Sequence, residues 1–292
     1  MSMIINPYVF GGAAPPSSGW AQLGNTLAVS QGISNVGCLN TTRVAVLGNT
    51  SDNLQAYSWD GTDYASEGTA LSTAAVGNDG RVEQLGTDAV FASPDGITWQ
   101  KYSHNGTAFS SVDSSISFST DSVGAGSTGT RFMPYRRSGE SGIATWDLAA
   151  TNWTRTGNIN ATAPNNFQRQ ANAVLNTTNN AERQVTWSNS DFTIRVFDFD
   201  GTDWVQTTGA STTHLLTSEN RGFLVRLSNT EFAFFGQTTN LIRYFSMSGD
   251  VITAGSTLAI AGANQASICA LNGYDISMYD GTAGLRTYRY TP

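Results

Sequence analysis

The chain has 292 residues, of which 13% are charged, 39% hydrophobic and 11% aromatic, and its formal net charge is −7. An acidic balance excludes a dedicated nucleic-acid binder, which needs a cationic surface to displace phosphate counterions. No run approaches the roughly 18 consecutive apolar residues of a membrane span, and two cysteines cannot build a disulfide framework or a zinc site.

Residues 1–17 differ from the rest of the chain and form a predicted N-terminal arm and linker. Residues 3–10 are apolar, and GGAAPPSS at 11–18 is a turn-prone connection. An exposed apolar strand is a liability unless it is covered, so we expect the arm either to fold onto its own domain or to add as a strand to a neighbouring protein. The side chains expected to make that contact are Ile4, Ile5, Tyr8, Val9 and Phe10.

From residue 18 onward the chain repeats one pattern: two aromatic residues separated by one position, a glycine turn, a bulky residue and usually a second glycine. The second glycine, or its replacement, recurs every 44 to 52 residues, at Gly24, Gly68, Asp113, Gly157, Gly209 and Gly255. The first copy predicts strands at 35–39, 43–47, 53–59 and 63–71, with a hairpin turn at 60–61. Four strands in 40 to 50 residues are typical of a propeller blade.

The sixth copy is divided between the two ends of the chain. It stops after Tyr288 and Tyr290, and its missing half stands at Trp20 and Gly24. A β-solenoid would not need its ends to complement each other, whereas a ring closed in this way has no ragged edge strand. The sequence therefore predicts an all-β, six-bladed β-propeller over residues 18–292, with four-stranded antiparallel blades and an N-terminal strand that completes the C-terminal blade.

The bulky residue of the pattern is predicted to pack between blades rather than to bind sugar, because it recurs in nearly every copy. Val251 is assigned to this position in the remaining copy. The third copy is expected to have a turn about two residues longer, at 148–151, and the fourth an Asn-rich insertion around 176–181. The predicted inter-blade residues are Trp20, Tyr64, Phe109, Trp153 and Trp204.

Few residues point to catalytic or metal chemistry. The segment SPDGITW at 93–99 resembles the Asp-box hairpin of sialidases and other propellers, whose aspartate caps its own turn. DFDGTD at 198–203 lacks the third alternating carboxylate of a calcium loop, and His104 stands at a repeated aromatic position. We therefore expect no catalytic residue, no metal site and no cofactor, and a protein that is not an enzyme.

The two cysteines fall in corresponding first strands of neighbouring blades. Cys38 and Cys269 are one residue out of register, and successive strand residues face opposite sides. They are predicted to be buried free thiols.

MIINPYVFGG at 3–12 looks like the start of many bacteriophage virion and tail-associated proteins, and blades carrying WDGT followed by an aromatic resemble repeats in such proteins. The resemblance implies a virion location, several copies on the particle, an arm that holds other virion proteins, and loops that reach the host surface or a glycan on it. It carries over no catalytic residues. Two alternatives stay open: a lectin-like carbohydrate-binding propeller, and a sialidase-like glycosidase, which needs clustered arginines at the ring axis.

Overall fold

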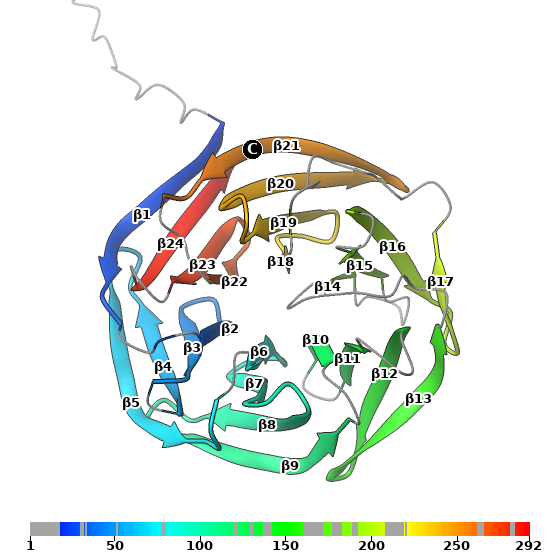
Figure 1. Cartoon of the computed structure of the whole chain (residues 1–292), viewed down its shortest axis with the longest axis horizontal. Coiled ribbons are helices and arrows are strands. Elements are labelled where there is room, and N and C mark those ends of the chain that lie inside the picture. The colour runs from blue at the N-terminus through cyan, green and yellow to red at the C-terminus, as the bar shows by residue number, and fades with distance from the viewer. Residues whose placement is uncertain are drawn as a thin grey trace, which may run out of the picture.

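The computed structural model describes residues 18–29, 32, 34–50, 52–76, 80–118, 122–128, 131–136, 142–160, 172–176, 183–188, 192–207, 219, 221–261, 266–280 and 284–292. Within these ranges the chain forms six four-stranded antiparallel sheets arranged as blades around one axis (Figure 1). The prediction of an all-β, six-bladed propeller is confirmed. Across the same ranges, no helix has the length and apolar character needed to cross a membrane.

The blades are numbered I to VI in chain order, and the strands of each are given from the axis outward. Blade I consists of β2 (Ser34–Asn40), β3 (Arg43–Gly48), β4 (Asn53–Trp59) and β5 (Tyr64–Ser72). Blade II consists of β6 (Arg81–Gln84), β7 (Ala89–Ser93), β8 (Thr98–His104) and β9 (Phe109–Ser117). Blade III consists of β10 (Ser122–Thr128), β11 (Arg131–Arg136), β12 (Gly142–Ala149) and β13 (Asn152–Asn160). Blade IV consists of β14 (Asn172–Asn176), β15 (Arg183–Ser188), β16 (Thr193–Phe199) and β17 (Trp204–Gln206). Blade V consists of β18 (Gly222–Arg226), β19 (Glu231–Gly236), β20 (Leu241–Ser248) and β21 (Val251–Ala259). Blade VI consists of β22 (Ser267–Asn272), β23 (Asp275–Asp280), β24 (Gly284–Thr291) and β1 (Gly19–Leu27).

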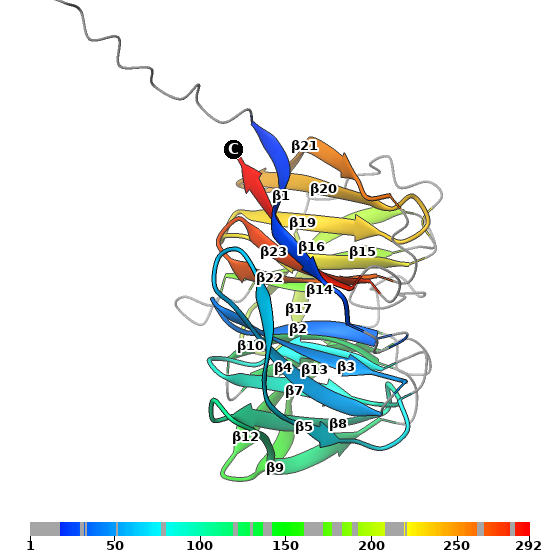
Figure 2. The ribbon, with the colours of Figure 1, turned by 90° about the vertical axis from the view of Figure 1, so that its left-hand side faces the viewer.

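The ring closes through blade VI. Strand β1 pairs antiparallel with β24, with Gly19 opposite Thr291 and Trp20 opposite Tyr290. The innermost strands β2, β6, β10, β14, β18 and β22 contact one another in an unbroken circle. Figure 2 views the ring from its side, with the start of β1 and the C terminus together at one edge. Because the first and last strands pair in one sheet, every blade, including blade VI, has a neighbouring blade on both sides.

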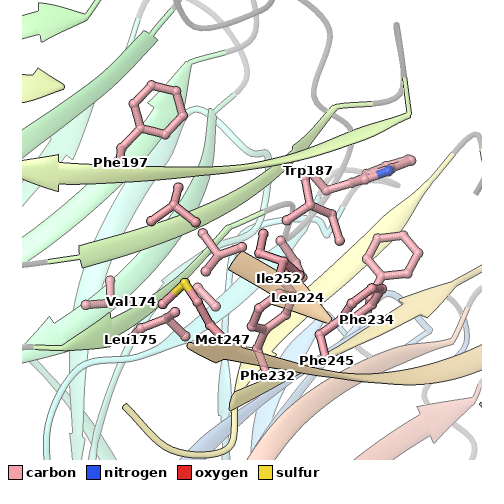
Figure 3. Close-up of a cluster of buried hydrophobic side chains, with 14 of the residues drawn as sticks. Val174, Leu175, Trp187, Phe197, Leu224, Phe232, Phe234, Phe245, Met247 and Ile252 are labelled. Atoms are coloured by element: carbon pink, nitrogen blue, oxygen red, sulfur yellow. The ribbon is translucent and has the colours of Figure 1, made fainter. Parts of the chain in front are cut away.

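Burial explains why strands such as β3 are apolar along nearly their whole length. Both faces of each blade are covered by its neighbours, so β3 (RVAVLG) is buried at almost every position, whereas the outer β5 (YASEGTALS) is mostly exposed. The hydrophobic clusters lie between blades. Figure 3 shows the one shared by blades IV and V, in which Trp187, Phe197 and Phe234 are fully buried.

The second glycine of the repeat marks a close approach between neighbouring blades. Gly24 and Gly68 have φ values of +55° and +68°, and a Cβ at either position would overlap a backbone carbonyl oxygen of the next blade, on Thr62 and Thr107 respectively. The amide that follows Gly24 donates to Thr62 O (3.0 Å), and the one that follows Gly68 donates to Thr107 O (2.9 Å). We call this contact the blade latch. Only glycine enters this left-handed region without strain and also leaves room for the neighbouring backbone.

The latch varies around the ring. Asp113 has a φ of +64°, and the next amide, on Ser114, donates to Thr151 O at 2.8 Å. Gly255 instead lies against the ring of Tyr244. Gly209 lies outside the described residues.

Two sequence assignments are corrected by strand register. Val251 is 64% exposed, and Met247 pairs with Ile252, so Ile252 and not Val251 occupies the repeated bulky position of blade V. The predicted longer turn of blade III is also wrong: Leu148 pairs with Trp153, which leaves the same four residues between partners as Trp59 and Tyr64 in blade I. The motif had been aligned on an aromatic residue two positions too early. Of the predicted insertion around 176–181, residues 177–181 lie outside the described residues.

Candidate functional site

A cavity of about 290 Å³ lies on the axis of the ring. It is surrounded by residues of β2, β6, β14, β18 and β22 and includes residues of the turns that follow β2 and β22, such as Thr41 and Gly273. The cavity therefore adjoins the face that carries the turns between first and second strands, which we call the hairpin face. Its size is at the lower end of small-molecule sites, roughly 300 to 1,000 Å³.

A buried leucine repeats at the end of the inner strands and sets their alignment. In blades I, IV and VI it stands where the first strand bulges before turning into the second, as shown by the pairing on either side of Leu39, Leu175 and Leu271. The residues at this position in blades I, II, IV, V and VI are Leu39, Leu85, Leu175, Leu227 and Leu271, all at most 7% exposed.

Counting back from this leucine shows where the repeat changes character. The residues two positions before it, in blades I, II, IV, V and VI, are Gly37, Glu83, Ala173, Val225 and Cys269. One position before it they are Cys38, Gln84, Val174, Arg226 and Ala270. Three positions before it they are Val36, Val82, Asn172, Leu224 and Ile268. Small or apolar residues dominate each set, and the charged exceptions are Glu83 and Arg226.

The exceptional residues line the axial cavity from different blades. Glu83 on β6 is 6% exposed, and Asn172 on β14 is 2% exposed and donates through Nδ2 to Gln184 Oε1 at 2.7 Å. Arg226 at the end of β18 stays accessible to solvent and donates through Nη2 to Asn229 Oδ1 at 2.6 Å. Burial lowers the pKa of Arg226, and a guanidinium remains a cation at neutral pH. The cavity thus combines an acid, an amide and a guanidinium on an aliphatic wall.

The two cysteines also line this cavity and are free and buried, as expected. Burial raises the pKa of Cys38 to about 12, and burial followed by the nearby Cys38 and Glu83 raises the pKa of Cys269. Because the thiolate is the reactive form, protonated thiols are poor nucleophiles. The two sulfur atoms make their part of the cavity wall polarizable and weakly polar.

The predicted inter-blade aromatics lie away from the cavity lining. The hydroxyl of Tyr64 in blade I donates to Ser277 Oγ of blade VI at 2.8 Å and is also hydrogen-bonded to Thr287 Oγ1 of that blade at 2.7 Å. Trp204 of blade IV donates through Nε1 to Thr145 Oγ1 of blade III at 3.1 Å.

The other three members of the set are also in contact with a neighbouring blade. Phe109 belongs to a cluster with residues of blade I, and the ring centroid of Trp153 lies 5.0 Å from that of Phe91 in blade II. Trp20 lies 5.1 Å from Tyr290 and packs on a cluster that includes Tyr244 of blade V. The arm residues Ile4, Ile5, Tyr8, Val9 and Phe10 lie outside the described residues.

The motifs of the sequence have structural roles here. Asp95 Oδ1 accepts from the amides of Ile97 and Thr98, both at 2.8 Å, and the following Trp99 is fully buried. His104 is 5% exposed with its ring 4.7 Å from that of Phe109, and burial lowers its pKa.

The DFDGTD segment is occupied by its own turn and by an ion pair. Asp200 Oδ1 accepts from the amides of Thr202 and Asp203, while Asp198 binds Arg183. Within the described part of the chain, no three His, Cys, Asp or Glu residues gather as metal ligands.

Charge also recurs outside the cavity, at the first residue of the second strand. The bidentate pairs Arg43–Glu67, Arg131–Asp147, Arg183–Asp198 and Asp275–Arg289 stand at this level of blades I, III, IV and VI. In blade V, Glu231 accepts from the hydroxyls of Tyr244 and Tyr274. Their recurrence assigns these pairs to the blade framework.

Comparison with known proteins identifies the fold alone. No protein-family model matches the sequence, and no curated protein matches it. The structure is similar to PQQ-bound aldose sugar dehydrogenase from Streptomyces coelicolor (TM-score 0.59, 11% identity, 95% of this chain and 100% of that chain). It is also similar to the six-bladed fucose-recognising lectin of the fungus Aleuria aurantia (TM-score 0.55, 11% identity, 89% of this chain and 93% of that chain). A third similar structure is the WD40 propeller domain of Doa1 (TM-score 0.56, 11% identity, 92% of this chain and 96% of that chain).

Proposed function

We propose that this protein is a non-enzymatic attachment component of a bacteriophage particle. The propeller is its rigid binding head, and residues 1–17 fasten that head to other virion proteins. The observation that carries the proposal is the position of ring closure: blade VI takes its fourth strand from Gly19–Leu27, which follows the resembling segment at 3–12 in the sequence. An apolar segment that precedes the closing strand in the sequence is suited to strand addition on a neighbour.

The chemistry of the axial cavity favours binding over turnover. Glycoside hydrolysis commonly requires two carboxylates flanking the bond, and the described cavity lining supplies one, Glu83. The same lining contains a single arginine, Arg226, rather than the cluster that a sialidase-like site needs. With the thiols held protonated, the cavity offers groups that hold a ligand in place.

The anchoring role is tested by incorporation into particles assembled without this protein. Full-length protein, a variant lacking residues 2–17, Phe10→Asp and the matched control Ser2→Asp are each added, and the amount that sediments with the particles is measured. We expect the deletion and Phe10→Asp to lose incorporation while Ser2→Asp keeps it. The melting temperature should not change in any of them, because closure begins at Gly19. Normal incorporation of the truncated protein would refute the anchoring role.

A second candidate is a carbohydrate-binding propeller, which the hydrogen-bonding groups of the cavity favour. The lectin with a similar fold recognises fucose, and sugar hydroxyls pair with amide and carboxylate groups such as those of Asn172 and Glu83. A glycan array with the full chain tests this reading. Asn172→Leu installs the residue type found at this position in blade V, so a glycan signal that survives the substitution would place carbohydrate binding elsewhere.

A further inference from the structure

Departures from the repeat separate functional residues from framework in this ring. A position that serves blade packing keeps one kind of residue in most blades, as the leucines buried in blades I, II, IV, V and VI show. Glu83 departs from a set that is otherwise glycine, alanine, valine and cysteine. Burying a carboxylate costs free energy that a small residue at the same place would not cost, so its presence at 6% exposure points to a role beyond packing.

The second charged departure lies on the opposite side of the axis. Following the contacts of the inner strands, β6 is separated from β18 by two strands in either direction, β10 and β14 or β2 and β22. Glu83 of blade II and Arg226 of blade V therefore line one cavity from opposing blades (Figure 1). The described charges of the lining are thus one negative and one positive residue, contributed by opposing blades.

From this arrangement we infer that the axial cavity binds a small zwitterion, with its cationic group at Glu83 and its carboxylate at Arg226. The class comprises amino acids and amino sugars that carry a carboxylate. The inference deepens the proposed function, since it names the ligand class of the binding head.

Other ligand classes fit the lining less well. A simple anion would meet the negative Glu83, and a simple cation would meet Arg226. Neutral sugars usually stack on an aromatic ring, and the described lining residues are aliphatic, polar or charged. A zwitterion satisfies both charges at once, through charge-assisted hydrogen bonds that are stronger than neutral ones. A guanidinium binds a carboxylate with two parallel N–H donors, which fixes the orientation of the ligand.

The inference is tested by calorimetric titration of the full-length protein with glycine, 4-aminobutanoate and 6-aminohexanoate, which act as a ruler for the charge separation. Hexanoate and hexylammonium, each with one of the two charges, are the matched probes. We expect at least one zwitterion to bind roughly tenfold or more tightly than either single-charge probe, the factor that one lost charge-assisted contact produces. Glu83→Gln and Arg226→Gln should each weaken that binding to a similar extent, whereas the exposed Arg155→Gln, which changes the net charge equally, should not.

Arg226→Gln places at the mouth the residue type that blade II already carries at the same position, Gln84, so it decides the result even if Glu83→Gln does not fold. Binding of hexanoate or hexylammonium as tight as that of the tightest zwitterion, unaltered zwitterion binding by Arg226→Gln, or no detectable binding of any of the three zwitterions would each overturn the inference. Particle incorporation of the wild-type protein is read separately. Normal incorporation without zwitterion binding refutes the ligand class alone, whereas zwitterion binding without incorporation refutes the anchoring role alone.

Discussion

Replacing Gly24 by alanine is expected to destabilise the ring well beyond the cost of the backbone conformation itself. Gly24 has a φ of +55°, and a left-handed conformation costs a residue with a Cβ about 1–2 kcal/mol. The added Cβ would also overlap Thr62 O, so β1 must move away from blade I. That movement breaks the bond from the amide of Asn25 to the same oxygen (3.0 Å), which contributes about 1 kcal/mol. The expected loss in free energy of unfolding is about 2–3 kcal/mol.

Gly249→Ala is a matched control for this substitution. Gly249 has nearly the same φ, +57°, but nothing lies within 4 Å of its ideal Cβ. It should therefore lose only the conformational part, about 1–2 kcal/mol. Urea unfolding followed by tryptophan fluorescence measures both variants against the wild type. If Gly24→Ala and Gly249→Ala lose the same free energy, the blade latch does not stabilise the ring and the reasoning fails.

Three further substitutions test contacts within and between blades. Burial raises the pKa of Tyr64. Its contribution to stability is therefore present below roughly pH 10, where unfolded tyrosine titrates, and is lost as the pH rises further. Tyr64→Phe should lose about 1–2 kcal/mol in free energy of unfolding at neutral pH, and its urea midpoint should decline less steeply than that of the wild type between pH 9 and 12. The guanidinium of Arg183 lowers the pKa of Asp198. The contribution of Asp198 to stability is therefore present above roughly pH 4 and is lost as the pH falls. Asp198→Asn should lose at most about 1 kcal/mol in free energy of unfolding, since the pair is partly exposed, and an unchanged midpoint of acid unfolding would contradict this. Trp204→Phe removes the indole donor to Thr145 and leaves a void between blades III and IV. The variant should lose about 1–3 kcal/mol in free energy of unfolding, and its melting temperature should fall. Full stability of the variant would show that this contact is dispensable.

The fold was predictable because its signals are local and repeated. Each Gly turn, each aromatic strand end and the divided sixth copy needs only a few neighbouring residues to be recognised. The errors arose where residue type was given priority over spacing: Val251 precedes the structural equivalent Ile252, and Trp146 was aligned in place of Leu148. In both cases the number of residues between hairpin partners, which backbone geometry fixes, was the better guide.

The candidate site was not predicted, for a related reason. Repetition drew attention to residues that every blade shares, whereas Glu83, Asn172 and Arg226 are the residues that differ between blades. Their convergence depends on ring closure, which brings β6, β14 and β18 around one axis. Aligning the inner strands on the buried leucines would have revealed the three exceptions. Their placement in one cavity still required the structure.

We propose that the residues which break the repeat form the ligand site. A crystal structure of the full-length protein with the tightest-binding ω-amino acid tests it most directly. We predict density for the ligand in the axial cavity, with its ammonium group within hydrogen-bond distance of Glu83 and its carboxylate on the guanidinium of Arg226. Ligand density at a blade interface or on the outer strands, with the axial cavity occupied only by water, would contradict it.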